Sequence, residues 1–460
     1  MKFYGRKQER KYLNILFGRQ NQQVYLIYGR RRIGKSELIK QALKETDKTS
    51  IYYECKQTTE QNNIESISQL LSETFGYPKP SFNSIEELLE FIFNESKERD
   101  IILVLDEFSY LREVVKGLDC ILQSLIDKYK EISTLKLVLC GSYVDVMKSL
   151  LEKENPLYGR IDKIIDLKQM DYYESSMFYS NYSNEDKVKL YSVFGGIPFY
   201  NSLIDTSLSV EENIIELIAS PNARLESEVS MYLKSEISKI NNANEVFETL
   251  AKGYSKFSDL LSQSHVSSSP TLVDVLEKLI QMEVVKKETP INDENNKRKA
   301  GYYITDNLSL FYYRYIFRHL SQVQVLNSEV FYQRYIKEDF ETKYVQHIFE
   351  NVCKQYLIYQ NKQGNIEEPF DKIDKYYYDN PKEKINGEFD IVTEDPNGFI
   401  FYEAKFRKEP ITEKKVKEEI EHVKATGLNS YRYGFFSKSG FEKENLENVS
   451  YYTLDDLYDL

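Results

Sequence analysis

Residues 24–36 read VYLIYGRRRIGKS, and they decide the fold of the first part of this 460-residue chain. The apolar run VYLIY predicts a buried strand, and SELIKQALK at 36–44 has the apolar spacing of a helix. Between them, residues 29–36 fit a phosphate-binding glycine loop at every required position. A strand, a glycine loop and a helix in this order predict a nucleotide-binding α/β domain.

The chemistry of phosphate binding explains the residue types in this loop. Backbone N–H groups can surround a phosphate only where side chains are small, and the following helix adds its positive N-terminal end. Lys35 is then expected to reach the β- and γ-phosphates, and the Ser36 hydroxyl to bind Mg²⁺. We therefore expect ATP and Mg²⁺ as cofactors. The candidate ATP-binding residues of the loop are Gly29, Arg30, Arg31, Arg32, Ile33, Gly34, Lys35 and Ser36.

Two further apolar runs end in polar residues. IILVL at 101–105 is followed by Asp106 and Glu107, and LKLVLC at 135–140 is followed by Gly141 and Ser142. A strand that ends in two carboxylates can place Asp106 beside Mg²⁺ and Glu107 beside the attacking water. Continuous apolar strands separated by helical segments predict a parallel sheet that is covered on both faces.

A set of motifs in the first 205 residues resembles the archaeal-type ATPase family, which belongs to the AAA+/STAND branch of P-loop NTPases. The motifs are FYGR at 3–6 with Glu9, GRRRIGKS at 29–36, VLDEF at 104–108, LCGS at 139–142, PLYGR at 156–160 and GGIP at 195–198. The resemblance implies that Ser142 senses the γ-phosphate and that Gly5 and Arg6 lie near the base. It also implies that Arg160 acts as an arginine finger in a neighbouring subunit, which requires a homo-oligomer.

Simpler roles are open for the same residues. Ser142 can cap the next helix, and Arg160 can be an ordinary surface arginine. The GGIP motif is expected to bend the backbone of a helical lid.

The middle of the chain resembles a winged helix-turn-helix. Residues 241–282 predict three short helices, and the strands MEVVKKE at 282–288 and GYYIT at 301–305 follow them. The polar connection INDENNKRKA at 291–300 is the expected wing tip. Residues 286–299 contain five basic and three acidic side chains, which is a modest patch. DNA contact and a structural or protein-contact role are both open for this module.

The second informative stretch is GEFDIVTEDPNGFIFYEAKF at 387–406. Asp395-Pro396-Asn397-Gly398 is a strong turn signal, so a β-hairpin is expected. If Asp395 pairs with Gly398, the register sets Asp390 opposite Glu403 and Glu388 opposite Lys405, all on one face. A solvated charged face would share this pattern.

Directly opposed carboxylates repel each other, and a divalent cation between them would relieve the repulsion. Asp390 and Glu403 are therefore candidate metal ligands, and Lys405 a candidate to polarise the attacking water. The pattern resembles the PD-(D/E)XK nuclease superfamily, with Glu350 as a further carboxylate. A C-terminal domain of unknown function in the archaeal-type ATPases often carries this pattern, and YRYGFFSKSGF at 431–441 resembles that domain as well.

The expected architecture has four parts. They are a P-loop ATPase core at 1–170, a helical lid at 171–238, a winged helix at 239–320 and a restriction-endonuclease-like α/β domain at 335–460. The net charge of −12 argues against a general nucleic-acid coat protein, so DNA contact needs a local basic face or a metal site. No apolar run is long enough to span a bilayer, and the four separated cysteines are typical of a reducing cytoplasm.

The sequence thus favours an ATPase that is coupled to a metal-dependent nuclease acting on DNA, in defence or DNA processing. The alternative is a non-catalytic signalling or scaffold ATPase whose C-terminal module binds a protein or nucleic-acid partner. A chaperone-like remodeller is a third hypothesis. Within this scheme Glu107, Arg160, Asp390, Glu403 and Lys405 are the candidate catalytic residues.

Overall fold

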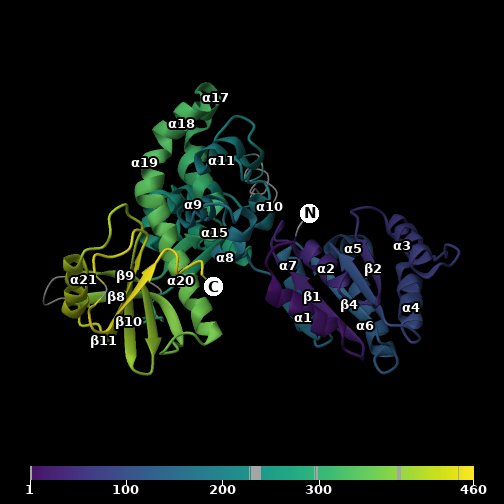
Figure 1. Cartoon of the computed structure of the whole chain (residues 1–460). Coiled ribbons are helices and arrows are strands. Elements are labelled where there is room, and N and C mark those ends of the chain that lie inside the picture. Colours follow the sequence, from purple (N-terminus) through teal and green to yellow (C-terminus); the bar gives the residue numbers. More distant parts are fainter. Residues whose placement is uncertain are drawn as a thin grey trace. The chain divides into compact units, whose positions relative to one another are not determined.

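The computed structural model of the chain describes residues 3–226, 228, 240–294, 296, 299–380, 385–443 and 445–459 (Figure 1). The chain divides into two compact units, and each is described by itself. The first unit contains Met1–Met170 together with Ile197–Phe199. The second contains Asp171–Gly196 and Tyr200–Leu460, which hold the expected winged helix, the C-terminal domain and the expected lid apart from Ile197–Phe199.

The first unit is built on a five-stranded sheet in the order β2-β3-β4-β1-β5, in which every neighbouring pair is parallel. This confirms the parallel sheet that the sequence predicts. Every residue of the three central strands is buried. Burial on both faces explains why these strands are continuous apolar runs. The strands are β1 (Gln23–Tyr28), β2 (Thr49–Glu54), β3 (Ile101–Asp106), β4 (Lys136–Gly141) and β5 (Lys163–Asp166).

Helices cover both faces of this sheet (Figure 1). One face packs against the helices between β2 and β4 in a single apolar cluster. On the other face the Tyr25 hydroxyl donates a hydrogen bond of 2.8 Å to Leu16 O of α1, and α1 contacts α2. The helices are α1 (Lys7–Phe17), α2 (Lys35–Leu43), α3 (Glu60–Phe75), α4 (Ile85–Glu95), α5 (Phe108–Val114), α6 (Leu118–Tyr129) and α7 (Val144–Lys148), followed by the turn η1 (Ser149–Leu151).

The second unit begins with helices. The expected lid contains α8 (Tyr172–Ser176), the turn η2 (Met177–Tyr179), α9 (Asn184–Phe194), α10 (Pro198–Asn201) and α11 (Val210–Leu217). Its end beyond residue 228 lies outside the described residues. Gly195 ends α9 with a positive φ of 60° and Pro198 starts α10, so the GGIP motif does bend the backbone.

Three helices and a hairpin follow in the expected order. They are α13 (Ala243–Ala251), α14 (Phe257–Gln263) and α15 (Ser269–Gln281), then the antiparallel strands β6 (Val285–Glu288) and β7 (Gly301–Ile304). A run of short helices then leads to the last domain. These are α16 (Asn307–Phe311), η3 (Tyr312–Ile316), η4 (Phe317–His319), α17 (Leu320–Val325), α18 (Ser328–Tyr335), α19 (Lys337–Asp339) and η5 (Phe340–Tyr344).

The chain ends in a mixed sheet in the order β12-β11-β10-β9-β8. β8, β9 and β10 form an antiparallel meander, and β10, β11 and β12 are parallel. Helix α21 supplies the crossover between β10 and β11. The elements are α20 (Val345–Gln363), β8 (Lys372–Asn380), β9 (Ile385–Asp395), β10 (Gly398–Lys405), α21 (Glu413–Ala425), β11 (Ser430–Ser437) and β12 (Val449–Thr453).

The hairpin β9–β10 has the register that the turn predicts. Asp395 pairs with Gly398, and the ladder continues to Ile391 opposite Tyr402. The expected pair Asp390–Glu403 lies one step beyond the end of this ladder. Glu388, expected opposite Lys405, is instead paired with Tyr377 of β8. The turn therefore fixes the register at the tip, and β8 pairs with the other side of β9 from Glu394 to Ile385.

The connection between β6 and β7 is not a free wing tip. Ile291 is only 8% exposed and belongs to the apolar core of the C-terminal domain. Its N–H donates a hydrogen bond of 2.9 Å to Lys375 O on β8, and the Tyr377 N–H donates one of 3.0 Å to Asn292 Oδ1. β8 is an edge strand of its sheet, so this connection caps an edge that would otherwise expose backbone groups. Lys297 and Arg298, counted in the basic patch, lie outside the described residues.

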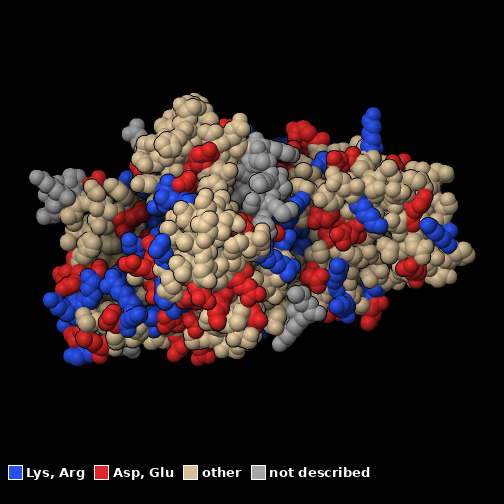
Figure 2. All heavy atoms as spheres, turned by 90° about the horizontal axis from the view of Figure 1, so that it is seen from above, with Lys and Arg blue, Asp and Glu red and all other residues tan. Residues whose placement is uncertain are grey.

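In the part of the chain that the structure describes, no helix is long and apolar enough to cross a membrane. On the face drawn in Figure 2, lysine and arginine side chains lie among aspartate and glutamate side chains. Helix α15, the expected reading helix, follows this pattern because Lys278 pairs with Asp274 at 2.7 Å.

Candidate functional site

The glycine loop connects β1 to α2 at the carboxyl edge of the first sheet. A Cβ atom on Gly29 would lie 2.4 Å from Leu167 O, so only glycine fits there. Gly34 caps α2 with φ 92°, a conformation that glycine adopts readily. The two glycines therefore allow the loop to turn tightly into the helix, as the sequence predicts.

Lys35 is buried under the loop. Its Nζ donates hydrogen bonds to Gly29 O at 2.8 Å, to Arg30 O at 3.1 Å and to Ser142 Oγ at 2.9 Å. Burial lowers the pKa of Lys35, although the carboxylates of Glu107 and Asp106 act in the opposite direction. All three ammonium hydrogens thus have acceptors inside the first unit.

Ser36 and Asp106 meet at the start of α2 and the end of β3. Ser36 Oγ donates a hydrogen bond of 2.6 Å to Asp106 Oδ2, and the Glu107 N–H donates one of 3.0 Å to Asp106 Oδ1. Burial would raise the pKa of Asp106, but hydrogen bonds from Cys140, Ser36 and Tyr52 outweigh it and lower the pKa. A hydroxyl beside an ionised carboxylate is a donor set that suits Mg²⁺.

Glu107 is held beside this pair in an unusual conformation. It has a positive φ of 50°, which is uncommon for a residue other than glycine. Its Oε1 accepts a hydrogen bond of 2.7 Å from Ser142 Oγ, and among the described residues its buried Oε2 has no hydrogen-bond partner. Such strain is typical of functional sites. Tyr143, not Ser142, is the N-cap of α7, so Ser142 does not act as that helix cap.

The three arginines of the loop have different surroundings. Arg30 is buried. The Arg31 guanidinium lies over the Tyr143 ring at 4.9 Å and donates to its hydroxyl. The Arg32 guanidinium lies 4.0 Å from the ring centre of Phe199, in the Ile197–Phe199 segment that packs with this unit. Ile33 is buried and anchors the loop.

Arg6 supports the loop from outside. Its guanidinium donates to Ile33 O at 3.3 Å and to Lys168 O at 2.6 Å, and it pairs with Glu9 at 3.1 Å. Arg6 is 3% exposed. The side chain that the resemblance placed near the base is therefore used to hold the loop backbone in this structure.

Arg160 lies far from the loop of its own chain. It forms a bidentate ion pair with Asp127, at 2.9 and 2.7 Å, which raises its pKa. The neighbouring Asp162 accepts a hydrogen bond from the N–H of Val24, at the amino end of β1. The glycine loop follows the other end of this six-residue strand, and Gly29 is five residues on from Val24, roughly 16 Å away. Arg160 cannot reach the ATP site of its own chain, so a finger role would have to be exercised in a neighbouring subunit.

The candidate residues of the C-terminal domain lie on neighbouring elements, with Asp390 on β9, Glu403 and Lys405 on β10 and Glu350 on α20. Asp390 pairs with Lys375 of β8 at 2.9 Å, and Glu403 pairs with Lys405. Burial raises the pKa of Glu403, and Lys405 offsets this only in part. Ala404 is buried, as expected for a residue that faces the core.

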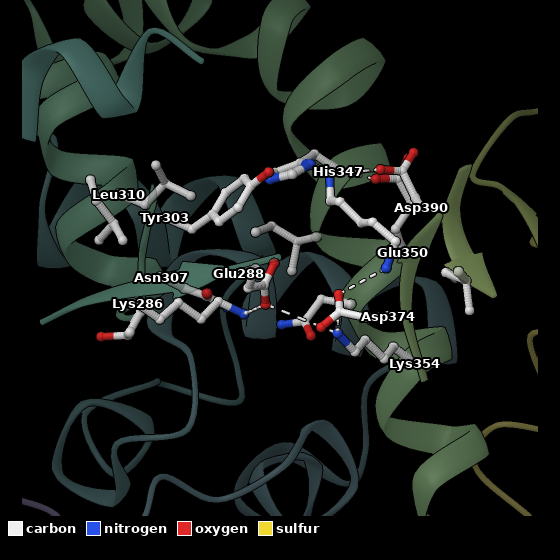
Figure 3. Close-up of a pocket in the computed structure, with 16 residues that line it drawn as sticks. Lys286, Glu288, Tyr303, Asn307, Leu310, His347, Glu350, Lys354, Asp374 and Asp390 are labelled. Carbon is white, nitrogen blue, oxygen red and sulfur yellow. Dashed lines mark hydrogen bonds and ion pairs between the residues drawn. The ribbon is translucent and has the colours of Figure 1, made fainter. Parts of the chain in front are cut away.

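Asp390 and Glu350 line a pocket of about 160 Å³ in the second unit, together with residues of β6, β7 and α16 (Figure 3). Several of its charged side chains form ion pairs. Lys375 contacts both Asp390 and Glu388, and Lys354 pairs with Asp374 at 3.0 Å. Burial would lower the pKa of Lys375, but its acidic neighbours raise it well above its usual value. Glu403 and Lys405 do not line this pocket.

These residues do not form a metal site as they stand. Within the described ranges there is no group of three or more histidine, cysteine, aspartate or glutamate side chains that could hold a metal ion. The expected repulsion between Asp390 and Glu403 is relieved differently, because each has its own lysine partner. The Glu388–Lys405 pair that the sequence predicts is replaced by Glu388–Lys375. Lys375 was missed because it lies outside the hairpin, on β8.

Comparisons with known proteins agree with a nucleotide-binding fold for the first unit. Residues 3–203 match the model of an ATPase domain found predominantly in archaea, and residues 312–420 match a family of archaeal and bacterial proteins of unknown function. An uncharacterized protein of Methanocaldococcus jannaschii, MJECL04, is 28% identical over 451 residues, which are 96% of this chain and 97% of that protein.

Two solved structures are similar to this chain. The Walker-type ATPase PABY2304 of Pyrococcus abyssi has a TM-score of 0.53 and 19% identity, over 68% of this chain and 96% of that one. The ORC2 protein of Aeropyrum pernix, solved as ADPNP and ADP complexes, has a TM-score of 0.46 and 15% identity, over 72% of this chain and 95% of that one. The likeness to PABY2304 supports the fold of the first unit.

The matched residues and the geometry of the site lead to the same assignment. The match at 3–203 contains the glycine loop, the acidic pair at the end of β3 and Ser142, which the structure brings together at one edge of the sheet. Residues 3–203 therefore belong to the family of ATPase domains found predominantly in archaea, and residues 312–420 to the archaeal and bacterial family of unknown function.

Proposed function

We propose that the chain is an ATP-hydrolysing switch whose catalytic glutamate is restrained until ATP binds. The observation that carries this proposal is the hydrogen-bonded chain from Lys35 Nζ to Ser142 Oγ, at 2.9 Å, and on to Glu107 Oε1, at 2.7 Å. The three residues come from α2, the end of β4 and the end of β3. They join the lysine proposed to bind phosphate to the glutamate proposed to orient the attacking water.

Bound ATP would break the first of these hydrogen bonds, the one from Lys35 to Ser142. Phosphate oxygens are charged acceptors and form stronger hydrogen bonds with Lys35 than the backbone carbonyls do. Ser142 then loses its donor from Lys35, and its hydroxyl becomes available to the γ-phosphate. Glu107 loses the hydrogen bond from Ser142 and is free to orient water as a general base.

Ser36 and Asp106 are the residues that would hold Mg²⁺. Their 2.6 Å hydrogen bond shows that both oxygens face one place at the end of the loop. When bound, Mg²⁺ supplies charge neutralisation for the phosphates. The protein's own part is to keep a hydroxyl and an ionised carboxylate ready at that place.

Residues Ile197–Phe199 are a route by which the nucleotide state can reach the second unit. They pack with the first unit although the chain on both sides belongs to the second. Arg32 of the glycine loop lies over Phe199, and a Cβ on Gly34 would lie 3.6 Å from Pro198 Cγ. A shift of the loop on binding phosphate would therefore displace this segment and the α9–α10 bend that contains it.

Nucleotide binding by matched variants tests the switch. We expect Lys35→Ala to abolish binding of a fluorescent ATP analogue, because the buried ammonium is the main cationic partner of the phosphates. Lys44→Ala removes an exposed lysine just after the same helix and is expected to bind as the wild type does. Equal affinity of Lys35→Ala and wild type would refute the ATP site.

Cleavage of DNA by the C-terminal domain is our second candidate function. It is favoured by the adjacent strands β9 and β10, which carry Asp390, Glu403 and Lys405 on one sheet. Lys375 must leave Asp390 before any cation can bind at that carboxylate. A C-terminal module that only binds a partner is the alternative outcome.

A cleavage assay separates these outcomes. Plasmid and single-stranded DNA are incubated with the protein and Mg²⁺ or Mn²⁺, with and without ATP. The nuclease hypothesis predicts cutting by wild type and by Lys408→Ala, whose lysine is exposed, and none by Lys405→Ala. If Lys405→Ala cuts as well as wild type, or if wild type does not cut at all, the domain is not a nuclease of this kind.

A further inference from the structure

Tyr52 is a residue at the ATP site that no sequence motif contains. It lies on β2, and its hydroxyl donates a hydrogen bond to Asp106 Oδ2. The same carboxylate oxygen accepts the hydrogen bond from Ser36 at 2.6 Å. Asp106 thus receives two hydroxyl donors on one oxygen and the Glu107 N–H on the other.

The strand register explains how Tyr52 reaches this place. Tyr52 pairs with Val104, and Glu54 pairs with Asp106, on the parallel strands β2 and β3. Side chains two residues apart share a face of the sheet. Tyr52 therefore lies diagonally opposite Asp106 on the same face, within reach of a long aromatic side chain. Lys40 Nζ of α2 lies 4.9 Å from the centre of its ring and helps to fix the ring.

The hydrogen bond from Tyr52 matters most when Ser36 is engaged elsewhere. Asp106 is 1% exposed, so its carboxylate cannot rely on bulk water for partners. With Mg²⁺ bound, the Ser36 oxygen would also be a ligand of the ion. The Tyr52 hydroxyl, the Cys140 thiol and the Glu107 N–H are the donors to this carboxylate that do not depend on Ser36.

We propose that Tyr52 is a positioning residue that fixes the Asp106 carboxylate for binding of Mg²⁺ with ATP. The inference rests on the proposed ATP site and assigns a residue to it that touches neither nucleotide nor metal. Groups that hold a metal ligand in place are commonly worth tenfold to a hundredfold in metal affinity.

The adjacent residue provides a matched control. Tyr53 is on the same strand, faces the other side of the sheet, and donates its hydroxyl hydrogen bond to Asn63. Tyr52→Phe and Tyr53→Phe each remove one hydroxyl and one hydrogen bond from β2. Only Tyr52→Phe removes a donor to Asp106, so a loss of general stability would affect both variants, whereas a metal effect would affect one.

The test measures affinity for a fluorescent ATP analogue in excess Mg²⁺ and in EDTA, with thermal melting to confirm folding. We expect Tyr52→Phe to bind roughly tenfold more weakly in Mg²⁺ and as wild type does in EDTA. Tyr53→Phe should match wild type in both. Binding of Mn²⁺ in the presence of ADP, followed by its electron paramagnetic resonance signal, gives a direct readout without turnover.

The measurements distinguish a failure of the role of Tyr52 from a failure of the proposed ATP site. If wild type binds nucleotide and gains affinity from Mg²⁺, but Tyr52→Phe gains as much, the role of Tyr52 is overturned while the ATP site stands. If wild type itself binds no nucleotide, the proposed function fails with it.

Discussion

The Ser142 hydroxyl donates a hydrogen bond of 2.7 Å to Glu107 Oε1, which joins the ends of two neighbouring strands, β4 and β3. The same hydroxyl accepts a hydrogen bond from Lys35. A single serine therefore links the lysine that we propose to bind phosphate to the glutamate that we propose for hydrolysis. This link distinguishes a restrained ATPase from a site in which the glutamate is always free.

Ser142→Ala tests the sensing of the γ-phosphate. A hydrogen bond to a charged group contributes about 1.5–3 kcal/mol, so its loss weakens ATP binding by about tenfold or more. ADP has no γ-phosphate, and its affinity should stay as in the wild type. Titration with both nucleotides measures the ratio. An ATP-to-ADP preference that is the same in Ser142→Ala and wild type would contradict the sensor role.

Phe199→Ala tests the route to the second unit. The variant removes the ring under the Arg32 guanidinium, and such contacts contribute about 0.5–2 kcal/mol. We expect ATP affinity to change by less than about tenfold. The ATP-dependent change in hydrogen exchange of α9 should be lost. If α9 responds to ATP in the variant as it does in wild type, the segment is not the route.

Buried Lys136 predicts how stability depends on pH. It is fully buried at the start of β4, where its Nζ donates to Asn21 O at 2.8 Å, and burial lowers its pKa to about 8. Between about pH 8 and the usual lysine pKa, the unfolded chain binds more protons than the folded one, so the free energy of unfolding rises with pH.

Urea unfolding of wild type and Lys136→Met between pH 7 and 10 measures this effect. The difference in the free energy of unfolding, wild type minus variant, should increase by about 2–3 kcal/mol over that range, since one pKa unit corresponds to about 1.4 kcal/mol. Below pH 8 the difference should be flat. Parallel curves for the two proteins would show that Lys136 keeps its ordinary pKa in the folded state.

Ile291→Ala tests whether the β6–β7 connection is part of the C-terminal core. Removing a buried isoleucine side chain costs about 2–5 kcal/mol, because contacts are lost and a cavity remains. Val325, also in the second unit, is 78% exposed, and Val325→Ala should change stability by less than about 0.5 kcal/mol. Urea unfolding followed by circular dichroism compares the two. A similar small effect of both variants would mean that the connection is a free wing.

Much of the ATP site is readable from the sequence because its residues lie directly after apolar strands. Lys35, Ser36, Asp106 and Ser142 each occur within two residues of a strand or loop end that the pattern identifies. The order of the strands is not readable in the same way. Tyr52 was missed because its role depends on β2 lying next to β3, which only the folded sheet reveals.

In the C-terminal domain, contacts set by a turn can be predicted from the sequence, whereas contacts with a third strand cannot. The turn at Asp395–Gly398 predicts the hairpin register correctly, since the turn itself sets that register. The partner of Asp390 comes from β8, fifteen residues earlier in the chain, and no turn rule addresses it. The polar stretch around Asn292 looks like a solvated loop, yet the neighbouring Ile291 is buried in the apolar core of the C-terminal domain.

The most direct test of the central claim is ATP hydrolysis by Glu107→Gln. The amide keeps the size of the side chain and removes the base, and general base catalysis is worth about 10²–10⁴-fold. We predict an ATP affinity within about twofold of wild type and hydrolysis at least about a hundredfold slower. Glu113→Gln, at an exposed position on helix α5, which begins directly after Glu107, should hydrolyse ATP normally. Hydrolysis by Glu107→Gln at the wild-type rate would contradict the account.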